Sequence, residues 1–335
     1  MARPASCSQG LATDSGRCRY KLQWTKQGVI FTPDNNYEWM VSHASIPIAE
    51  RYGQTLRVYF GTRDSQGRSL PAYVELDADN PRQVVRVNDQ PLLMLGELGS
   101  FDDSGIMPSW IVEHGGRKYL YYIGWNPQVT VSYRLSIGLA ISDDGGETFT
   151  KYSIGPICDR ATEEPFFNTA PCVIIENAIW RMWYISCTGW KIIAGRPEPA
   201  YHVKYAESSD GVHWDRTGHI CIDYDDFTQA IGRPCVYQED NLYKMLYSYR
   251  GVDGYRTDAN QAYRLGYAES RDGLYWTRKD SDVGIALSSE GWDSQMMEYC
   301  SIYRDDEHTY LFYNGNGFGK SGFGYAIPTK TDIGV

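Results

Sequence analysis

Three ionisable side chains, His43, Arg233 and Glu298, stand in short apolar segments of the chain. Glu298 interrupts the run SQMMEYCSIY, residues 294–303, which otherwise has the composition of a buried β-strand. An unpaired carboxylate is costly to bury, so we expect it to have a partner or a function. Imidazole and carboxyl groups exchange protons, and a guanidinium binds carboxylates or phosphates. The three residue types therefore predict acid–base chemistry on a ligand with an anionic group.

Five internal repeats provide the framework for these residues. Each repeat carries a tyrosine in an apolar, strand-like run, and successive tyrosines are 62 to 66 residues apart. The repeat tyrosines are Tyr59, Tyr122, Tyr184, Tyr247 and Tyr313. Three repeats continue into an A-x-S-x-D-G sequence, whose Asp-Gly pair is typical of a tight hairpin turn. The pattern therefore predicts a set of antiparallel strands in each repeat.

We interpret each repeat as one four-stranded blade of an all-β, five-bladed β-propeller, because radial repetition of such sheets is typical of that fold. The last repeat lacks a fourth strand, and residues 20–31, which contain WTKQGVIF, are predicted to supply it. Residues 1–335 would then form a single domain. The predicted blades span residues 38–96, 101–158, 162–221, 226–288 and 292–328. Two β-sandwiches would not explain five regular spacings.

The first strand of each repeat is expected to face the propeller axis. When these strands are aligned, their second residues form a predicted ring of side chains. The ring consists of His43, Met107, Ala170, Arg233 and Glu298. Blades one and five are neighbours in a closed ring, so His43 and Glu298 are expected to lie close together. The alternative interpretation is a buried polar ring that holds the blades together without a ligand.

Loops that lead into these strands add further candidates. Asp103 and Glu164 stand just ahead of the predicted ring, beside apolar neighbours, and are additional catalytic candidates. Trp125 and Trp190 could stack on a sugar ring. Tyr299, which follows Glu298, is a candidate for substrate binding.

The repeat form YAESSDGVHW, the segment YNGNGFG at 313–319 and the segment YEWMVSHA at 37–44 resemble the five-bladed propeller glycosidases of glycoside hydrolase families 32 and 43. The resemblance covers nearly the whole chain. It implies acids on the inner strands of the first three blades, two of which act in glycoside hydrolysis. Ser42 or His43, Met107 and Thr169 stand at those positions here, so the standard acids are absent.

Three functions are consistent with these observations. The first is an enzyme that acts on a sugar or sugar-like molecule through a rebuilt site, with His43 and Glu298 as the acid–base pair and Arg233 on an anionic group. Hydrolysis, isomerisation, elimination and cyclisation all fit these residues. Ser42 and Thr169 would then be substrate-binding residues. The alternative is a non-catalytic propeller that binds a glycan or metabolite; a scaffold role is the third candidate.

Composition limits the partners. The net charge of −10 argues against nucleic acids and anionic membranes. No apolar run is long enough for a transmembrane helix, and the first residues lack the apolar segment of a signal peptide, so a cytoplasmic protein is expected. The eight cysteines have no metal-type spacing and are predicted to be small buried residues. No cofactor is expected, although His43, Glu298 and a loop aspartate would suit a divalent metal such as calcium.

Overall fold

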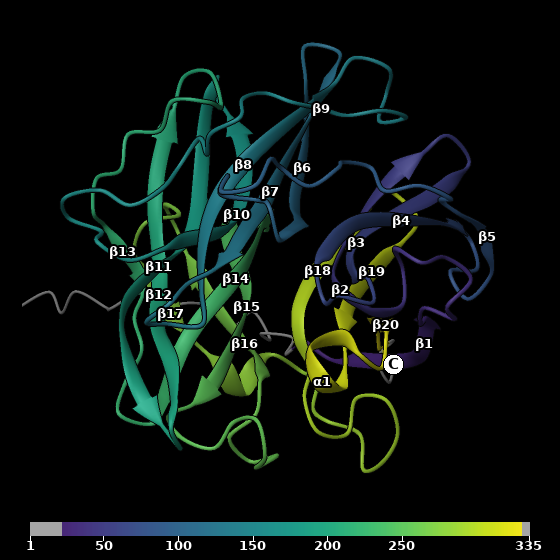
Figure 1. Cartoon of the computed structure of the whole chain (residues 1–335). Helices are drawn as coiled ribbons and strands as arrows, with labels where there is room; N and C mark the ends of the chain where they lie inside the picture. The colour runs from purple at the N-terminus through teal and green to yellow at the C-terminus, as the bar shows by residue number, and fades with distance from the viewer. Residues whose placement is uncertain (1–21, 330–335) are drawn as a thin grey trace, which may run out of the picture.

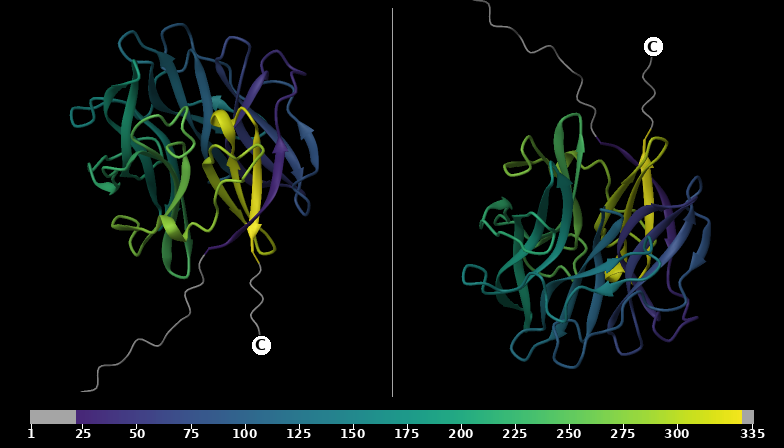
Figure 2. Two further views of the ribbon diagram at one scale, coloured as in Figure 1. Left: turned by 90° about the horizontal axis from the view of Figure 1, so that it is seen from below. Right: turned by 90° about the horizontal axis from the view of Figure 1, so that it is seen from above.

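The computed structural model describes residues 22–329, and almost all of its regular structure is β-strand (Figure 1). The first strand of each repeat contacts the first strands of the preceding and following repeats, and the fifth contacts the first. These inner strands are β2 (Ser42–Tyr52), β6 (Gly105–His114), β10 (Asn168–Glu176), β14 (Thr228–Glu239) and β18 (Glu298–Arg304). In Figure 2 the sheets follow one another around the molecule in chain order. The predicted five-bladed, all-β propeller is confirmed.

The first four blades are each formed by four consecutive strands. Blade one is β2, β3 (Thr55–Arg63), β4 (Ser69–Asp77) and β5 (Val84–Val87). Blade two is β6, β7 (Arg117–Pro127), β8 (Tyr133–Ser142) and β9 (Thr150–Lys151). Blade three is β10, β11 (Ile179–Ile193), β12 (Arg196–Ser208) and β13 (Ile220–Ile222). Blade four is β14, β15 (Leu242–Gly251), β16 (Arg264–Ser270) and β17 (Trp276–Arg278), followed by the 3-10 turn η1 (Asp280–Asp282).

The two ends of the described chain share the fifth blade. Three of its strands are β18, β19 (Thr309–Asn314) and β20 (Phe323–Pro328), with the short helix α1 (Asn316–Gly319) between the last two. The fourth strand is β1 (Trp24–Phe31), which pairs antiparallel with β20 and lies beside it in Figure 2. The predicted closing strand is therefore confirmed, while residues 20 and 21 of that prediction lie outside the described residues.

The Asp-Gly turns of blades two, three and four each contact the preceding blade. Gly146, Gly211 and Gly273 donate their amides to the serine of the A-x-S-x-D-G sequence, at 2.7, 2.9 and 2.9 Å. Their carbonyl oxygens accept hydrogen bonds from the previous blade. The donors are Arg57 at 2.7 Å, Tyr121 at 2.8 Å and Trp183 at 2.8 Å. The repeated motif thus serves inter-blade contacts as well as turns.

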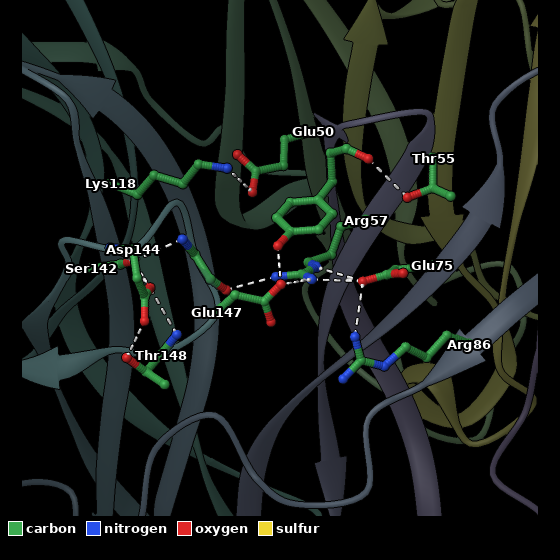
Figure 3. A network of polar contacts seen from close by, with 12 residues as sticks. Glu50, Thr55, Arg57, Glu75, Arg86, Lys118, Ser142, Asp144, Glu147 and Thr148 are labelled. Carbon is green, nitrogen blue, oxygen red and sulfur yellow. Dashed lines mark hydrogen bonds and ion pairs between the residues drawn. The ribbon is translucent and has the colours of Figure 1, made fainter.

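The contact between blades one and two contains a fully buried arginine (Figure 3). The guanidinium of Arg57 pairs with Glu75 at 2.6 Å. Its Cζ lies 3.5 Å from the ring centroid of Tyr52 and 4.2 Å from that of Tyr73. Lys118 of blade two pairs with Glu50 of blade one at 2.7 Å. Arg57 thus shows how this chain stabilises a buried cation, with a carboxylate, a carbonyl and two aromatic rings.

Each repeat tyrosine donates its hydroxyl proton to a carboxylate. The pairs are Tyr59 with Glu50, Tyr122 with Asp102, Tyr184 with Glu164, Tyr247 with Asp280, and Tyr313 with Asp293. Each carboxylate also pairs with a lysine or arginine. These cations are Lys118, Lys151, Arg216, Arg278 and Lys26, respectively. The repeat tyrosine is therefore the centre of a Tyr–carboxylate–cation triad in every blade.

The six described cysteines are free and buried, as the sequence predicted, while Cys7 and Cys18 lie outside residues 22–329. They fill space in the core, where a small apolar side chain is favoured. In the same part of the chain, no helix has the length and apolar character to span a membrane.

Candidate functional site

A cavity of about 330 Å³ lies among the inner strands, and residues from all five blades line it. All five inner strands contribute the residue at one equivalent position to the lining. The five residues at this position are Ile46, Met107, Ala170, Arg233 and Tyr299. We call them the floor ring.

The floor ring corresponds to a β-bulge that recurs around the propeller. In β2, β10, β14 and β18 the strand register shifts across this position. Ile46, Ala170, Arg233 and Tyr299 have φ values of 58°, 47°, 53° and 54°, in the left-handed region that non-glycine residues seldom adopt. A bulge turns a side chain out of the regular alternation of a strand. Here it directs one residue from each of these strands towards the cavity.

This register corrects the predicted ring in two blades. Met107, Ala170 and Arg233 are members as predicted, but the blade-one member is Ile46 rather than His43, and the blade-five member is Tyr299 rather than Glu298. The reason in blade one is that β2 contains two register shifts, Ser42 to Ser45 and Ser45 to Ile48. The residue after the floor ring is proline in blades one to four, so Pro47 is the sequence signal that aligns blade one.

His43 lies outside the cavity lining and does not contact Glu298. Its Nδ1 is 2.9 Å from the hydroxyl oxygen of Ser42, which is also outside the lining. Burial, and then the positive charges of Arg63 and Lys320, lower the pKa of His43 to about 4. The imidazole is therefore neutral at pH 7. The expected acid–base pair of His43 and Glu298 is not formed: His43 stands three residues before the floor-ring residue of its strand, and Glu298 one residue before that of its own strand.

Glu298 is fully buried, immediately before the floor-ring residue Tyr299. Its Oε1 accepts a hydrogen bond from Nδ2 of Asn314 at 3.1 Å, and its Oε2 has no partner. Burial raises the pKa of Glu298 to about 8, against the opposing effects of Asn314, Tyr299 and Arg63. Glu298 is therefore a protonated acid at neutral pH, one residue away from the cavity wall.

Four arginines line the cavity: Arg63, Arg233, Arg250 and Arg256. Arg256 is neutralised by Glu198, with Nε–Oε1 and Nη2–Oε2 distances of 2.8 and 3.2 Å. Within residues 22–329, the other three form no ion pair, and no aspartate or glutamate is among the lining residues. The wall of the cavity is thus strongly positive.

Arg233 is the least compensated of these cations. It is fully buried, and Nη1 donates to the carbonyl oxygen of Cys300 at 3.0 Å. Its Nε and Nη2 have no hydrogen-bond partner, and burial lowers its pKa. The Cζ atom lies 5.4 Å from the ring centroid of Trp110. Nε of Arg250 is also buried without a partner.

The other predicted site residues divide between the cavity and its surroundings. Thr169 and Trp125 line the cavity, and the buried hydroxyl of Thr169 has no partner. Trp190 is outside the lining but packs edge-on against two lining rings, those of Tyr133 and Phe167.

Asp103 and Glu164, predicted as catalytic candidates, are outside the lining. Asp103 shapes a turn: its Oδ2 accepts the amide of Gly99 at 2.9 Å, and its Oδ1 the hydroxyl of Ser104 at 2.8 Å. Glu164 is the carboxylate of the blade-three triad, and it also pairs with Lys204 at 3.3 Å. Both carboxylates are therefore engaged in local structure rather than directed at the cavity.

The metal site envisaged for His43, Glu298 and a loop aspartate is not formed. Among the described residues, the one group of side chains close enough to share a metal ion is Asp79, Glu307 and His308. Its two carboxylates are exposed, and none of its members lines the cavity.

Sequence reasoning missed several lining residues, above all Arg63, Arg250 and Arg256. Arg63 and Arg250 stand four and three residues after the repeat tyrosines of their blades, at the same end of the second strand. That recurrence is a readable signal. Tyr201 and Tyr263, whose hydroxyls hydrogen-bond to each other across the lining, were also missed. The loop that carries Arg256 has no counterpart in the other repeats and offers no such signal.

The fold, a five-bladed propeller, is similar to that of solved glycoside hydrolases. The structure of a thermostable family-43 glycoside hydrolase has a TM-score of 0.63 at 14% identity, and the match covers 89% of this chain and 90% of that one. A glycosyl hydrolase from Bacteroides ovatus has a TM-score of 0.68 at 17% identity, covering 93% and 96%. A GH32 β-fructofuranosidase of Bombyx mori, in complex with sucrose, has a TM-score of 0.58 at 15% identity, covering 89% and 61%. At these identities the likeness establishes the fold alone.

The chain belongs to the same family as the uncharacterized protein MT1551 of Mycobacterium tuberculosis (strain CDC 1551 / Oshkosh). The two are 36% identical over 308 residues, which cover 91% of this chain and 99% of the relative. The uncharacterized protein Rv1502 of strain H37Rv matches over the same length at the same identity. No family model matches the chain.

Proposed function

We propose that this protein is an enzyme that acts on an anionic, sugar-like small molecule bound in the central cavity. The observation that carries the proposal is a cavity lined by Arg63, Arg233 and Arg250, with no described aspartate or glutamate in its wall. A buried charge needs a counter-charge, and here no described carboxylate provides one. An anionic ligand would supply it.

The shape and chemistry of the cavity support a small, partly apolar ligand. Its volume of about 330 Å³ is at the lower end of the usual range for small-molecule sites. Trp125, Tyr133 and Phe318 offer aromatic faces on which the apolar side of a sugar ring can pack. The fold class, which includes many carbohydrate-active enzymes, adds support by analogy only.

Glu298 is our candidate for the acid of the reaction. General acid catalysis requires a group that holds its proton at the working pH, and a carboxyl group with a pKa of about 8 does so. Oε2 has no competing partner, and Tyr299 and Arg63, which both influence the Glu298 carboxyl, line the cavity. We leave His43 out of this proposal because its lowered pKa, about 4, leaves it without a proton to donate at pH 7.

Binding without turnover is the second candidate function. The observation in its favour is that the wall holds no carboxylate among the described residues, so neither acid of a standard two-carboxylate hydrolase is present there.

The deciding experiment compares wild type with Glu298→Gln on panels of neutral hexoses, hexuronates and hexose phosphates. Products would be followed by mass spectrometry and ligand binding by calorimetry. We expect turnover of an anionic member, reduced about 100-fold by Glu298→Gln with binding retained. The control is Glu163→Gln, at an exposed position outside the lining, which should leave turnover unchanged. Binding without product in wild type would favour the second function, and full turnover by Glu298→Gln would rule out this role for Glu298.

A further inference from the structure

We propose that the ligand of this cavity carries a dianionic group of the phosphate-monoester type, recognised by Arg63, Arg233 and Arg250. This inference rests on the proposed function, in that the cavity takes an anionic, sugar-like molecule, and adds the charge class of the substrate.

The first argument is the number of uncompensated charges. Arginine remains protonated in proteins, so the three guanidiniums stay charged even in a desolvated wall. Arg256 is already paired with Glu198, and Glu298, whose pKa burial raises to about 8, does not neutralise its surroundings at pH 7. A monocarboxylate would leave two of the three charges without a counter-charge. A dianion leaves one.

The second argument is the number of unused donors. Nε and Nη2 of Arg233 and Nε of Arg250 are buried and unpartnered, as is the hydroxyl of Thr169. All three residues belong to the cavity lining, but the four atoms themselves are covered, so a ligand reaches them only when these side chains turn towards it. A phosphate group offers three acceptor oxygens, and planar guanidiniums bind such groups with paired hydrogen bonds. A phosphate group therefore provides both the acceptor oxygens that these donors lack and the negative charge that the arginines lack.

The third argument is a comparison inside the same molecule. Arg57 and Arg233 are both fully buried. Arg57 pairs with Glu75 (Figure 3), and the carbonyl oxygen of Gly146 and two tyrosine rings also surround it. Arg233 has the carbonyl oxygen of Cys300 and a more distant tryptophan ring. The chain thus satisfies a buried arginine that has a structural role, and leaves Arg233 incomplete.

The first test measures thermal unfolding of the full-length protein at pH 7 in sodium sulfate and sodium phosphate, against acetate and chloride at matched ionic strength. Hexose 6-phosphate and hexuronate are then titrated by calorimetry. We expect sulfate and phosphate to raise the melting temperature, with an apparent Kd at least tenfold below that of acetate. In the calorimetric titrations, we expect hexose 6-phosphate to bind more tightly than hexuronate. Equal effects of dianions and monoanions, or preference for hexuronate, would overturn the inference.

The second test uses Arg233→Met with Arg57→Met as the matched control. Removing an uncompensated buried charge should raise the melting temperature of the ligand-free protein, and should weaken sulfate binding at least tenfold. Arg57→Met should instead lower the melting temperature and, if folded, keep the sulfate effect. If Arg233→Met fails to fold, sulfate binding is measured in Arg63→Met instead, because Arg63 also lines the cavity and is only half-buried. This variant should also bind sulfate at least tenfold more weakly. Sulfate stabilisation that survives loss of either cavity arginine would contradict the proposal.

The experiments distinguish failure of the enzymatic function from failure of the dianion inference. If hexose 6-phosphate binds through these arginines but yields no product, the dianion inference stands and the enzymatic function does not. If an uncharged sugar or a hexuronate is turned over instead, catalysis stands and the dianion inference falls.

Discussion

Asn314 connects Glu298 to the floor of the cavity across the junction of blades five and one. Its Nδ2 donates to Oε1 of Glu298 at 3.1 Å, and its Oδ1 accepts the amide N–H of Ile46 at 3.0 Å. The carboxyl group that we propose as the acid is therefore also part of the contact that joins the two ends of the ring. Asn314 occupies Oε1, and the buried Oε2 has no hydrogen-bond partner.

The raised pKa of Glu298 should appear in the pH dependence of folding. The native protein holds a proton between about pH 4.5 and 8 that the unfolded chain releases, so stability should fall as pH rises through this window. The expected slope is about 1.4 kcal/mol per pH unit. Glu298→Gln, which can keep the hydrogen bond from Asn314, should lack this component. Urea unfolding of both proteins at several pH values measures it, and parallel curves would contradict a raised pKa.

His43 should show the opposite dependence. Its pKa is about 4 in the native protein against 6.5 in the unfolded chain. The unfolded chain thus binds a proton that the native state excludes, and stability is lost as pH falls from 6.5 to 4, by about 1.4 kcal/mol per pH unit. His43→Asn should remove this component, since asparagine tolerates the φ of 65° at this position. An unchanged acid limb of the urea midpoints would show that His43 does not titrate in this way.

Glu164 should prove structural rather than catalytic. Glu164→Gln leaves Lys204 and Arg216 without their negative partner in a buried site, which should cost about 3–5 kcal/mol. Glu163→Gln, at the exposed neighbouring position, should change stability by less than about 0.5 kcal/mol. Chemical denaturation measures both. The folded Glu164→Gln protein should retain sulfate-dependent stabilisation, because Glu164 does not line the cavity; loss of that stabilisation would return it to the functional site.

The blade-three Asp-Gly turn should be intolerant of a methyl group. A Cβ at Gly211 would lie 2.7 Å from the ring of Trp180 and 2.8 Å from the hydroxyl of Tyr121, and φ is 76°. At Gly195 φ is similar, 79°, but no atom lies within 4 Å of the added Cβ. Both alanine variants should lose about 1–2 kcal/mol from the backbone, and Gly211→Ala about 1–3 kcal/mol more from crowding. Equal losses in melting temperature would mean that the blade contact adapts to the methyl group.

The sequence by itself determined the architecture of this protein. The tyrosine period, the Asp-Gly turns and the missing fourth strand are local features, and each predicts its element without knowledge of distant contacts. The triads were also partly readable, because Asp102, Glu164 and Asp293 each stand 20 residues before a repeat tyrosine. The 20-residue spacing therefore predicts that Glu164 is the triad carboxylate of blade three, a structural role rather than a catalytic one.

Tertiary structure was needed to decide which side chains face the cavity, above all in blade five, where no proline follows the floor-ring residue. Alternate residues of a strand point to opposite faces, so each bulge changes the assignment of the residues beyond it. The bulges in β2 and β18 replaced His43 by Ile46 and Glu298 by Tyr299. The convergence of the arginines on one cavity also depends on the closed ring, because Arg63 and Arg250 stand at strand ends of different blades and Arg256 stands in a loop.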